Sequence, residues 1–199
     1  RREPLAPTGI LMREKTPLGM ARVSYFRSGS AGSLLSEKDI DPSFVGSHSM
    51  AHVSGVTPAL GPAAQKAAHA FLRVARETGV KTVFDLNYRS KLWSPKVAGP
   101  ALAALAGLAD IVIGGSEEWK LAFGTDELGD ISLAPNTALV RTDGSNPVIA
   151  LVQGRRITQE TLTAQAVDVV GAGDAFVGGL LSALLADADW ETALRQGTF

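Results

Sequence analysis

A glycine-rich turn stands directly before an uncharged run of residues near the end of the chain. Gly171-Ala172-Gly173 precede Asp174, and no charged side chain occurs from Ala175 to Ala186. This pattern predicts a buried helix whose first backbone N–H groups are free and whose dipole favours an anion. Asp174 would lie beside that anion site, where its carboxylate can accept a proton from an attacking hydroxyl. The simpler alternative is an Asp that only stabilises its own helix terminus.

A second polar group follows a predicted strand over residues 80–86. Asp85, Asn87 and Arg89 alternate with Phe84, Leu86 and Tyr88. In an extended chain the three polar side chains share one face. Ligands of open α/β sheets collect beyond the carboxyl ends of strands, so Asn87 and Arg89 are candidates to hold a phosphate. The alternative is a solvated strand end with a surface ion pair.

The first part of the chain predicts a small antiparallel flap. Residues 9–14 and 20–27 are two strand-like runs separated by a charged turn that contains Pro and Gly. Tyr25 and Arg27 share one face of the second run, and an Arg is a suitable partner for a carboxylate. A surface strand with an extended, solvated Arg is the alternative. Residues 28–33 are small and suit a hinge.

The remaining segments alternate between short β-branched runs and longer runs rich in Ala and Leu. This alternation predicts βαβ units, and hence an α/β fold with a mainly parallel sheet. Helices are expected at 59–78, from Ser94-Pro95 to about Leu108, at 116–123 before Gly124, and from near Gly173. Strands are expected at 80–86, 110–113, 138–141 and 148–153, the last two around a turn that contains Gly144.

Composition narrows the classes of function. The chain has 199 residues, no Cys and a net charge of -1. Disulfide frameworks and thiolate chemistry are therefore excluded, and the near-neutral charge argues against binding to nucleic acid or an anionic membrane. We see neither a signal peptide nor a run apolar enough to span a membrane, so we expect a cytoplasmic protein.

Two competing signals are weak. His48 and His52 have a spacing that suits metal ligands on a helix, but Val53 favours a strand and no third ligand is adjacent. Ordinary core or rim histidines are the preferred interpretation. The motifs of P-loop enzymes and of protein kinases do not occur.

These motifs carry a family resemblance. The string from Asp168 to Phe176, Asp-Val-Val-Gly-Ala-Gly-Asp-Ala-Phe, resembles the signature of the ribokinase (PfkB) carbohydrate kinases. The string from Asp85 to Trp93 resembles the form found in the 2-keto-3-deoxygluconate kinase branch of that family. The resemblance implies a three-layer ribokinase-like core at residues 29–199 and part of a β lid at residues 5–28.

The resemblance also implies roles for individual residues. Asp174 would be the catalytic base and would contact the substrate, and the three residues before it would form the anion hole: Gly171, Ala172 and Gly173. Asn87 and Arg89 would contact the ATP phosphates, and Gly144 would belong to the turn on the adenosine side. Glu118 would help to place Mg²⁺ through water, and Tyr25 and Arg27 would hold an acid sugar.

The implied activity is transfer of the γ-phosphoryl group of ATP to the terminal hydroxyl of a keto acid sugar, above all 2-keto-3-deoxygluconate. The implied ligands are ATP, Mg²⁺ and a monovalent cation near Asp168, and a homo-oligomer through the lid is expected. Fructokinase or 5-dehydro-2-deoxygluconokinase activity is an alternative, as is a binding protein without catalysis.

The chain departs from the family pattern at Gly115, Pro147 and Phe26. These positions bear on the metal site, the nucleotide turn and a sugar hydrogen bond, respectively. Relative to the family pattern we also expect part of the sugar pocket to precede residue 1 and part of the adenine pocket to follow Phe199.

Overall fold

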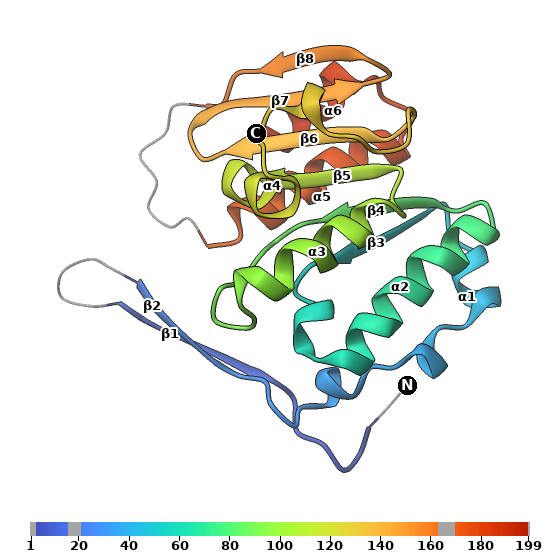
Figure 1. The fold of residues 1–199 in the computed structure, drawn as a ribbon, viewed down its shortest axis with the longest axis vertical. Helices are drawn as coiled ribbons and strands as arrows, with labels where there is room; N and C mark the ends of the chain where they lie inside the picture. The colour runs from blue at the N-terminus through green and yellow to red at the C-terminus, as the bar shows by residue number, and fades with distance from the viewer. Residues whose placement is uncertain (1–2, 16–20, 163–169, 199) are drawn as a thin grey trace.

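The computed structural model describes residues 3–15, 21–162 and 170–198. In this part of the chain, six strands form one sheet in the order β3-β4-β5-β6-β7-β8 (Figure 1). Their bounds are Met50–Ser54, Lys81–Asp85, Ile111–Gly115, Ala138–Asp143, Asn146–Val152 and Arg155–Gln159. Strands β3 to β6 are parallel, whereas β7 and β8 each pair antiparallel with the preceding strand.

The predicted mainly parallel α/β sheet is therefore confirmed. Strand β8 was not predicted, because Ile157 is the single apolar side chain in that strand and gives no alternating pattern. Gly144 lies in the turn between β6 and β7 with a φ of 57°, a left-handed conformation that glycine adopts without strain.

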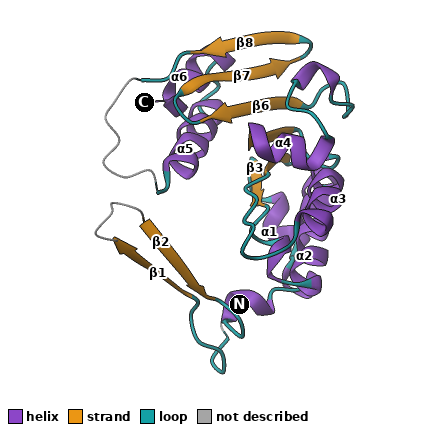
Figure 2. Cartoon of the chain, turned by 60° about the vertical axis from the view of Figure 1, so that its left-hand side comes forward, coloured by secondary structure: helices purple, strands orange, loops and turns teal. Residues whose placement is uncertain are grey.

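Helices cover both faces of the sheet and make three layers (Figure 2). One face carries α2 (Pro62–Glu77), α3 (Pro95–Ala106) and α4 (Ser116–Phe123), and α1 (Pro42–Gly46) packs beside α2. The opposite face carries α5 (Ala172–Leu185) and α6 (Trp190–Thr198). Two main clusters of buried side chains fill the spaces between these layers, one around Phe84, Leu102 and Trp119 and the other around Val83, Phe176 and Leu180.

Helix boundaries follow local signals closely. Helix α4 has the predicted bounds and ends at Gly124, which is left-handed at φ 79°. Helix α2 begins later than predicted, because residues 58–60 form a separate 3-10 turn (Pro58–Leu60) and Gly61 at φ 142° interrupts the chain. Further 3-10 turns lie at Ala31–Leu34, Glu37–Asp39 and Leu128–Asp130.

The expectation that α5 is buried all round is wrong. Its apolar side chains Phe176, Val177, Leu180 and Ala183 are buried, but its first turn and Leu185 are exposed. The helix packs on the sheet and on α6 along one side only, so the absence of charge did not report burial of every face. Helix α6 was not predicted as a separate element.

Residues before the core form the predicted antiparallel flap. Strands β1 (Ile10–Lys15) and β2 (Ala21–Phe26) make their own two-stranded sheet, in which Leu11 is opposite Tyr25. Figures 1 and 2 show this pair standing away from the six-stranded sheet. We refer to β1 and β2 as the lid.

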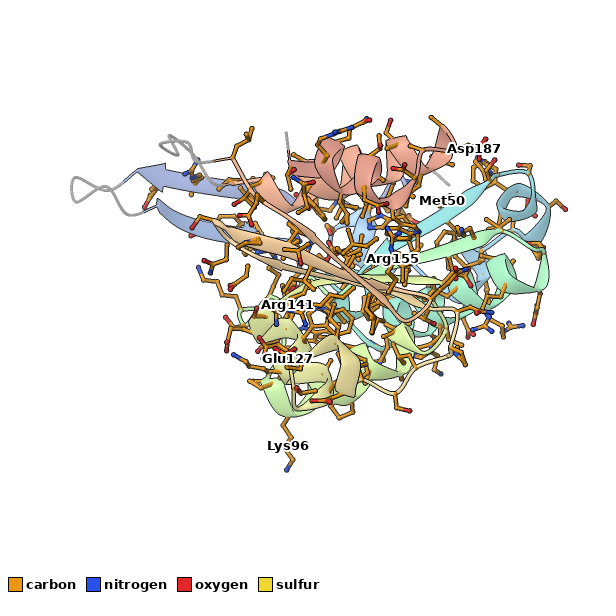
Figure 3. The ribbon with its side chains drawn as sticks, turned by 90° about the horizontal axis from the view of Figure 1, so that it is seen from above. Met50, Lys96, Glu127, Arg141, Arg155 and Asp187 are labelled. Atoms are coloured by element: carbon orange, nitrogen blue, oxygen red, sulfur yellow. The ribbon has the colours of Figure 1, made fainter. Side chains whose placement is uncertain are left out.

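Side chains on the α4 face of the sheet form an ion-pair group away from the lid. Arg141 on β6 points toward Glu127, at 3.7 Å, and also pairs with Asp126 (Figure 3). His48 follows α1 whereas His52 lies on β3, so the two do not share a helix face. Among the helices that the structure describes, none is long and apolar enough to span a lipid bilayer.

Candidate active site

A cavity of about 600 Å³ lies between the lid, the carboxyl ends of the parallel strands and the beginning of α5. This is the edge at which α/β sheets collect ligands. Most of the predicted site residues line it: Tyr25, Arg27, Asn87, Arg89, Glu118, Gly171, Gly173 and Asp174. Residues from both ends of the chain are therefore brought to one place.

The first turn of α5 forms one wall of the cavity. Gly171 is left-handed at φ 83°, and the first hydrogen bond of the helix joins Ala175 N–H to Gly171 O at 2.8 Å. The N–H groups of the three residues between them precede that bond, so they are the helix's unpaired donors. Gly171, Gly173 and Asp174 line the cavity, whereas Ala172 is not among the lining residues.

The opposite wall is the segment that leaves β4. The strand ends at Asp85, but the predicted alternation continues: Phe84 and Leu86 are fully buried in the core, and Asp85, Asn87 and Arg89 face the cavity. Asn87 adopts a left-handed φ of 34°. Its Nδ2 donates a 3.1 Å hydrogen bond to Asp85 Oδ2.

Asp85 was named in the sequence analysis only as part of a motif, and the structure gives it a specific environment. It is 9% exposed, and burial, reinforced by the nearby Glu118 carboxylate, raises its pKa to about 7. The hydrogen bond from Asn87 opposes this rise. A buried acid next to a cavity is a frequent property of functional sites.

Glu118 binds two backbone groups. Its Oε2 accepts the N–H of Gly115 and its Oε1 accepts the N–H of Tyr88, each at 2.7 Å. Burial raises the pKa of Glu118, and these two hydrogen bonds oppose the rise. At the departure from the family pattern, a Cβ on Gly115 would meet Glu118 Oε2 at an ordinary 3.5 Å, so the local space does not demand glycine.

The lid closes a third side. Leu11, Arg13, Tyr25 and Arg27 alternate along its two strands and line the cavity. The Arg27 guanidinium lies 4.7 Å from the centre of the Tyr25 ring, a cation–π geometry. Phe26 is 56% exposed and is not among the lining residues, as expected for the opposite strand face.

Several residues that line the cavity were not predicted from the sequence. Arg13 stands two positions from Leu11 on the cavity face of β1, and the same alternation that identified Arg27 could have identified it. Ser54 and Thr142 reach the cavity from the ends of β3 and β6, which no local pattern marks. Gly144 does not line this cavity, and Asp168 with its expected cation lies outside the described residues.

Carboxylates around the cavity are compatible with a magnesium ion that arrives with phosphates. Asp85, Glu118 and Asp174 all line it, yet the described residues contain no group of three or more acidic or His side chains that could hold a metal by themselves. Mg²⁺ commonly keeps several waters and binds one or two carboxylates together with substrate phosphates. The residues present fit that mode.

Comparisons with known proteins agree with this geometry. The chain is 34% identical over 183 residues to the 2-dehydro-3-deoxygalactonokinase of Haloferax volcanii, covering 88% of this chain and 57% of that protein. It is 28% identical over 206 residues to the 2-dehydro-3-deoxygluconokinase of Bacillus subtilis, covering 96% and 61%. The crystal structure of 2-dehydro-3-deoxygluconokinase from Thermotoga maritima superposes with a TM-score of 0.80 at 25% identity, covering 96% of this chain and 64% of that one.

The chain thus spans about three fifths of the length of the curated relatives that it matches. The family model described as "pfkB family carbohydrate kinase" matches residues 2–198, nearly the whole chain. With that match, and with a cavity that joins the glycine turn of α5 to the end of β4, the chain belongs to the pfkB family of carbohydrate kinases.

Proposed function

We propose that the protein is a sugar kinase that transfers the γ-phosphoryl group of ATP to the terminal hydroxyl of a keto acid sugar of the 2-keto-3-deoxygluconate class. The observation that carries the proposal is the single cavity that holds Asp174, the donors of the α5 turn, and the lid pair Tyr25 and Arg27. The kinases of deoxy keto acid sugars among the relatives support the choice of sugar class.

Asp174 is the proposed catalytic base. As the sugar hydroxyl oxygen forms its bond to the γ-phosphorus, the bond from that phosphorus to the bridging oxygen breaks and ADP leaves with the electron pair. The hydroxyl proton passes to the Asp174 carboxylate. Positioning and charge stabilisation supply most of the rate in such transfers, so a base within the cavity needs no covalent partner.

The negative charge on the transferred phosphoryl group must be stabilised by hydrogen-bond donors. We assign these to the free N–H groups at the start of α5, where the helix dipole adds to them, and to the Arg89 guanidinium and the Asn87 side chain across the cavity. Bound Mg²⁺ would neutralise phosphate charge. Glu118 would orient water for that ion while it keeps its two backbone hydrogen bonds, because each carboxylate oxygen has a second lone pair.

The lid supplies the proposed selectivity for an acid. Arg27 can pair with the sugar carboxylate through two parallel N–H donors, and its contact with the Tyr25 ring holds the guanidinium plane. A neutral sugar would leave this cation unused. Closure of the lid would exclude water and so limit hydrolysis of ATP.

The outer face of the lid is the proposed contact of a homo-oligomer. Ile10, Met12 and Phe26 are between 47% and 61% exposed, and all three lie on the face that points away from the cavity. We expect Phe26→Ser to lower the molar mass measured by light scattering. An unchanged mass would place the contact elsewhere or show a monomer.

The test of the proposed activity is ADP release from Mg-ATP with 2-keto-3-deoxygluconate, with fructose and 5-dehydro-2-deoxygluconate in parallel. Asp174→Asn should lower kcat about 100- to 10,000-fold with an unchanged far-UV spectrum. Asp187→Asn is the matched control, because Asp187 lies at the other end of α5, away from the lid (Figure 3), and its left-handed φ of 57° suits Asn. Turnover that survives Asp174→Asn would remove the assigned base, and ATP binding without turnover of any sugar would favour a binding protein.

A further inference from the structure

Asp85 is a buried acid for which the proposed reaction has no direct use. Its backbone is fixed in the sheet, in register with Ser54 on β3 and Ile113 on β5, and its carbonyl accepts the Gly55 N–H at 2.8 Å. The side chain therefore projects from a rigid strand end. A carboxylate in that position can hold a neighbouring group with little freedom of its own.

The neighbouring group is Asn87, and its backbone is held on both sides. Leu86 N–H donates to Ile113 O at 2.8 Å, and Tyr88 N–H donates to Glu118 at 2.7 Å. Leu86 packs closely against two glycines. A Cβ added to Gly55 would lie 2.0 Å from the Leu86 carbonyl oxygen, and a Cβ added to Gly114 would lie 2.6 Å from Leu86 Cδ1. Asn87 is thus held in its left-handed conformation, and its side chain is placed at the cavity.

The side chain of Asn87 still has two orientations of its amide, and Asp85 selects between them. The Asp85 oxygen that accepts from the Nδ2 of Asn87 disfavours the flipped amide, whose oxygen would face it, and does so most strongly when Asp85 is ionised and has only acceptor atoms. This leaves the amide oxygen and the second N–H of Asn87 for a ligand in the cavity.

The surroundings of Asp85 destabilise the ionised carboxylate that accepts this hydrogen bond. Glu118 from α4 and Asp174 from α5 both oppose the negative charge on Asp85, whereas Arg89 on the same loop favours it. Lid residues Arg13 and Arg27 line the same cavity. Burial of a carboxyl group among other carboxylates destabilises the ionised form, and such an arrangement is a mark of a functional group.

We infer that Asp85 is a positioning residue of the phosphoryl-transfer site, which holds the Asn87 amide in one orientation so that Asn87 offers its oxygen and one N–H to the ligand. The inference rests on the proposed function, because it names how one wall of that cavity is organised. Asp85 acts through Asn87 and does not contact the reacting atoms.

A double-mutant cycle on kcat tests the inference. Asp85→Leu keeps the branching at Cγ but removes the acceptor, and it should lower kcat about 10- to 100-fold, with the KM for the sugar unchanged. Asp85→Asn keeps one acceptor oxygen but adds an NH₂ group that can face Asn87 instead, so it should restore only part of the kcat that Asp85→Leu loses. Asn87→Ala should also lower kcat, and the double variant Asp85→Leu/Asn87→Ala should be no slower than Asn87→Ala alone.

Independent, multiplying losses in the double variant would overturn the inference, as would full activity of Asp85→Leu. If Asp85→Leu does not fold, Asp85→Ala takes its place in the cycle. Urea unfolding of each variant shows whether a lower kcat comes from a less stable fold or from a misplaced Asn87 side chain in a stable one.

A second measurement does not depend on activity. The side-chain NH₂ signals of Asn87, identified by their absence in Asn87→Ala, should move in Asp85→Leu and move less in Asp85→Asn, which keeps one acceptor oxygen. Unmoved signals in Asp85→Leu would show that Asp85 does not hold the amide. If the wild-type chain phosphorylates none of the three sugars, the proposed function fails, and these signals alone decide the positioning role.

Discussion

The backbone N–H of Tyr88 and the side chain of Glu118 are joined by a 2.7 Å hydrogen bond across 30 positions of sequence. A second bond of the same length joins the Glu118 carboxylate to Gly115 at the beginning of α4. Glu118 therefore connects the segment after β4 to the junction of β5 and α4. Two walls of the cavity are held at a fixed separation by one side chain.

The first prediction concerns this connection. Glu118→Gln should lower the free energy of unfolding by about 1–3 kcal/mol, because an NH₂ group must then face one of the two backbone N–H donors. Urea unfolding without Mg²⁺ measures this loss. The control is Glu117→Gln, since Glu117 is exposed and forms a surface ion pair with Lys120. Equal stability of the two variants would contradict a bracing role for Glu118.

The preference for an acidic sugar over a neutral one should depend on Arg27 of the lid. Arg27→Ala should lower kcat/KM for 2-keto-3-deoxygluconate about 10- to 100-fold and change the value for fructose much less, because only the acid sugar loses a charge-assisted hydrogen bond. Glu14→Ala is the control for general damage to the lid, because Glu14 is exposed on β1 and neither lines the cavity nor belongs to the proposed oligomer contact. Equal losses for both sugars would mean that Arg27 does not bind the carboxylate of the acid sugar.

Asn87 allows its backbone and its side chain to be tested separately. Both Asn87→Gly and Asn87→Ala lose the hydrogen bond to the buried Asp85, but a left-handed φ favours Gly and penalises Ala, so Asn87→Ala should lose about 1 kcal/mol more unfolding free energy than Asn87→Gly. Both variants should lose turnover, because both lack the amide. An active Asn87→Gly enzyme would show that only the backbone conformation matters.

Stability should fall as pH rises in a way that depends on Asp85. Its pKa is raised from an ordinary 3.8 to about 7 by burial and by Glu118. The folded state therefore holds a proton that the unfolded state releases, so the contribution is fully present below about pH 4 and is lost as pH rises through 7.

Relative to wild type, Asp85→Asn should gain about 3 kcal/mol of unfolding free energy between pH 5 and pH 8, since one pKa unit corresponds to about 1.4 kcal/mol. Chemical unfolding in buffers with EDTA at both values measures this gain. A difference between the two proteins that does not change with pH would show that Asp85 keeps an ordinary pKa.

Short-range patterns in the sequence predicted part of the local structure of the site, but not the left-handed conformation of Asn87. Periodicity of two identified the cavity faces of the segment after β4 and of β2, and the glycines before Asp174 marked the start of α5. Helix α4 and its end at Gly124 follow from cap signals within one turn. These features depend on a few neighbouring residues, and so a single sequence contains them.

Only the tertiary structure decided which residues of these segments contact one another and which of them are buried. The burial of Asp85, the two hydrogen bonds of Glu118 and the place of Arg13 on the cavity wall all depend on contacts between elements far apart in the chain. The exposed side of α5 likewise depends on which layers pack against it. Local periodicity fixes which way a side chain points along its own element, but the neighbour it meets is set by the path of the connections and by the packing of the sheet.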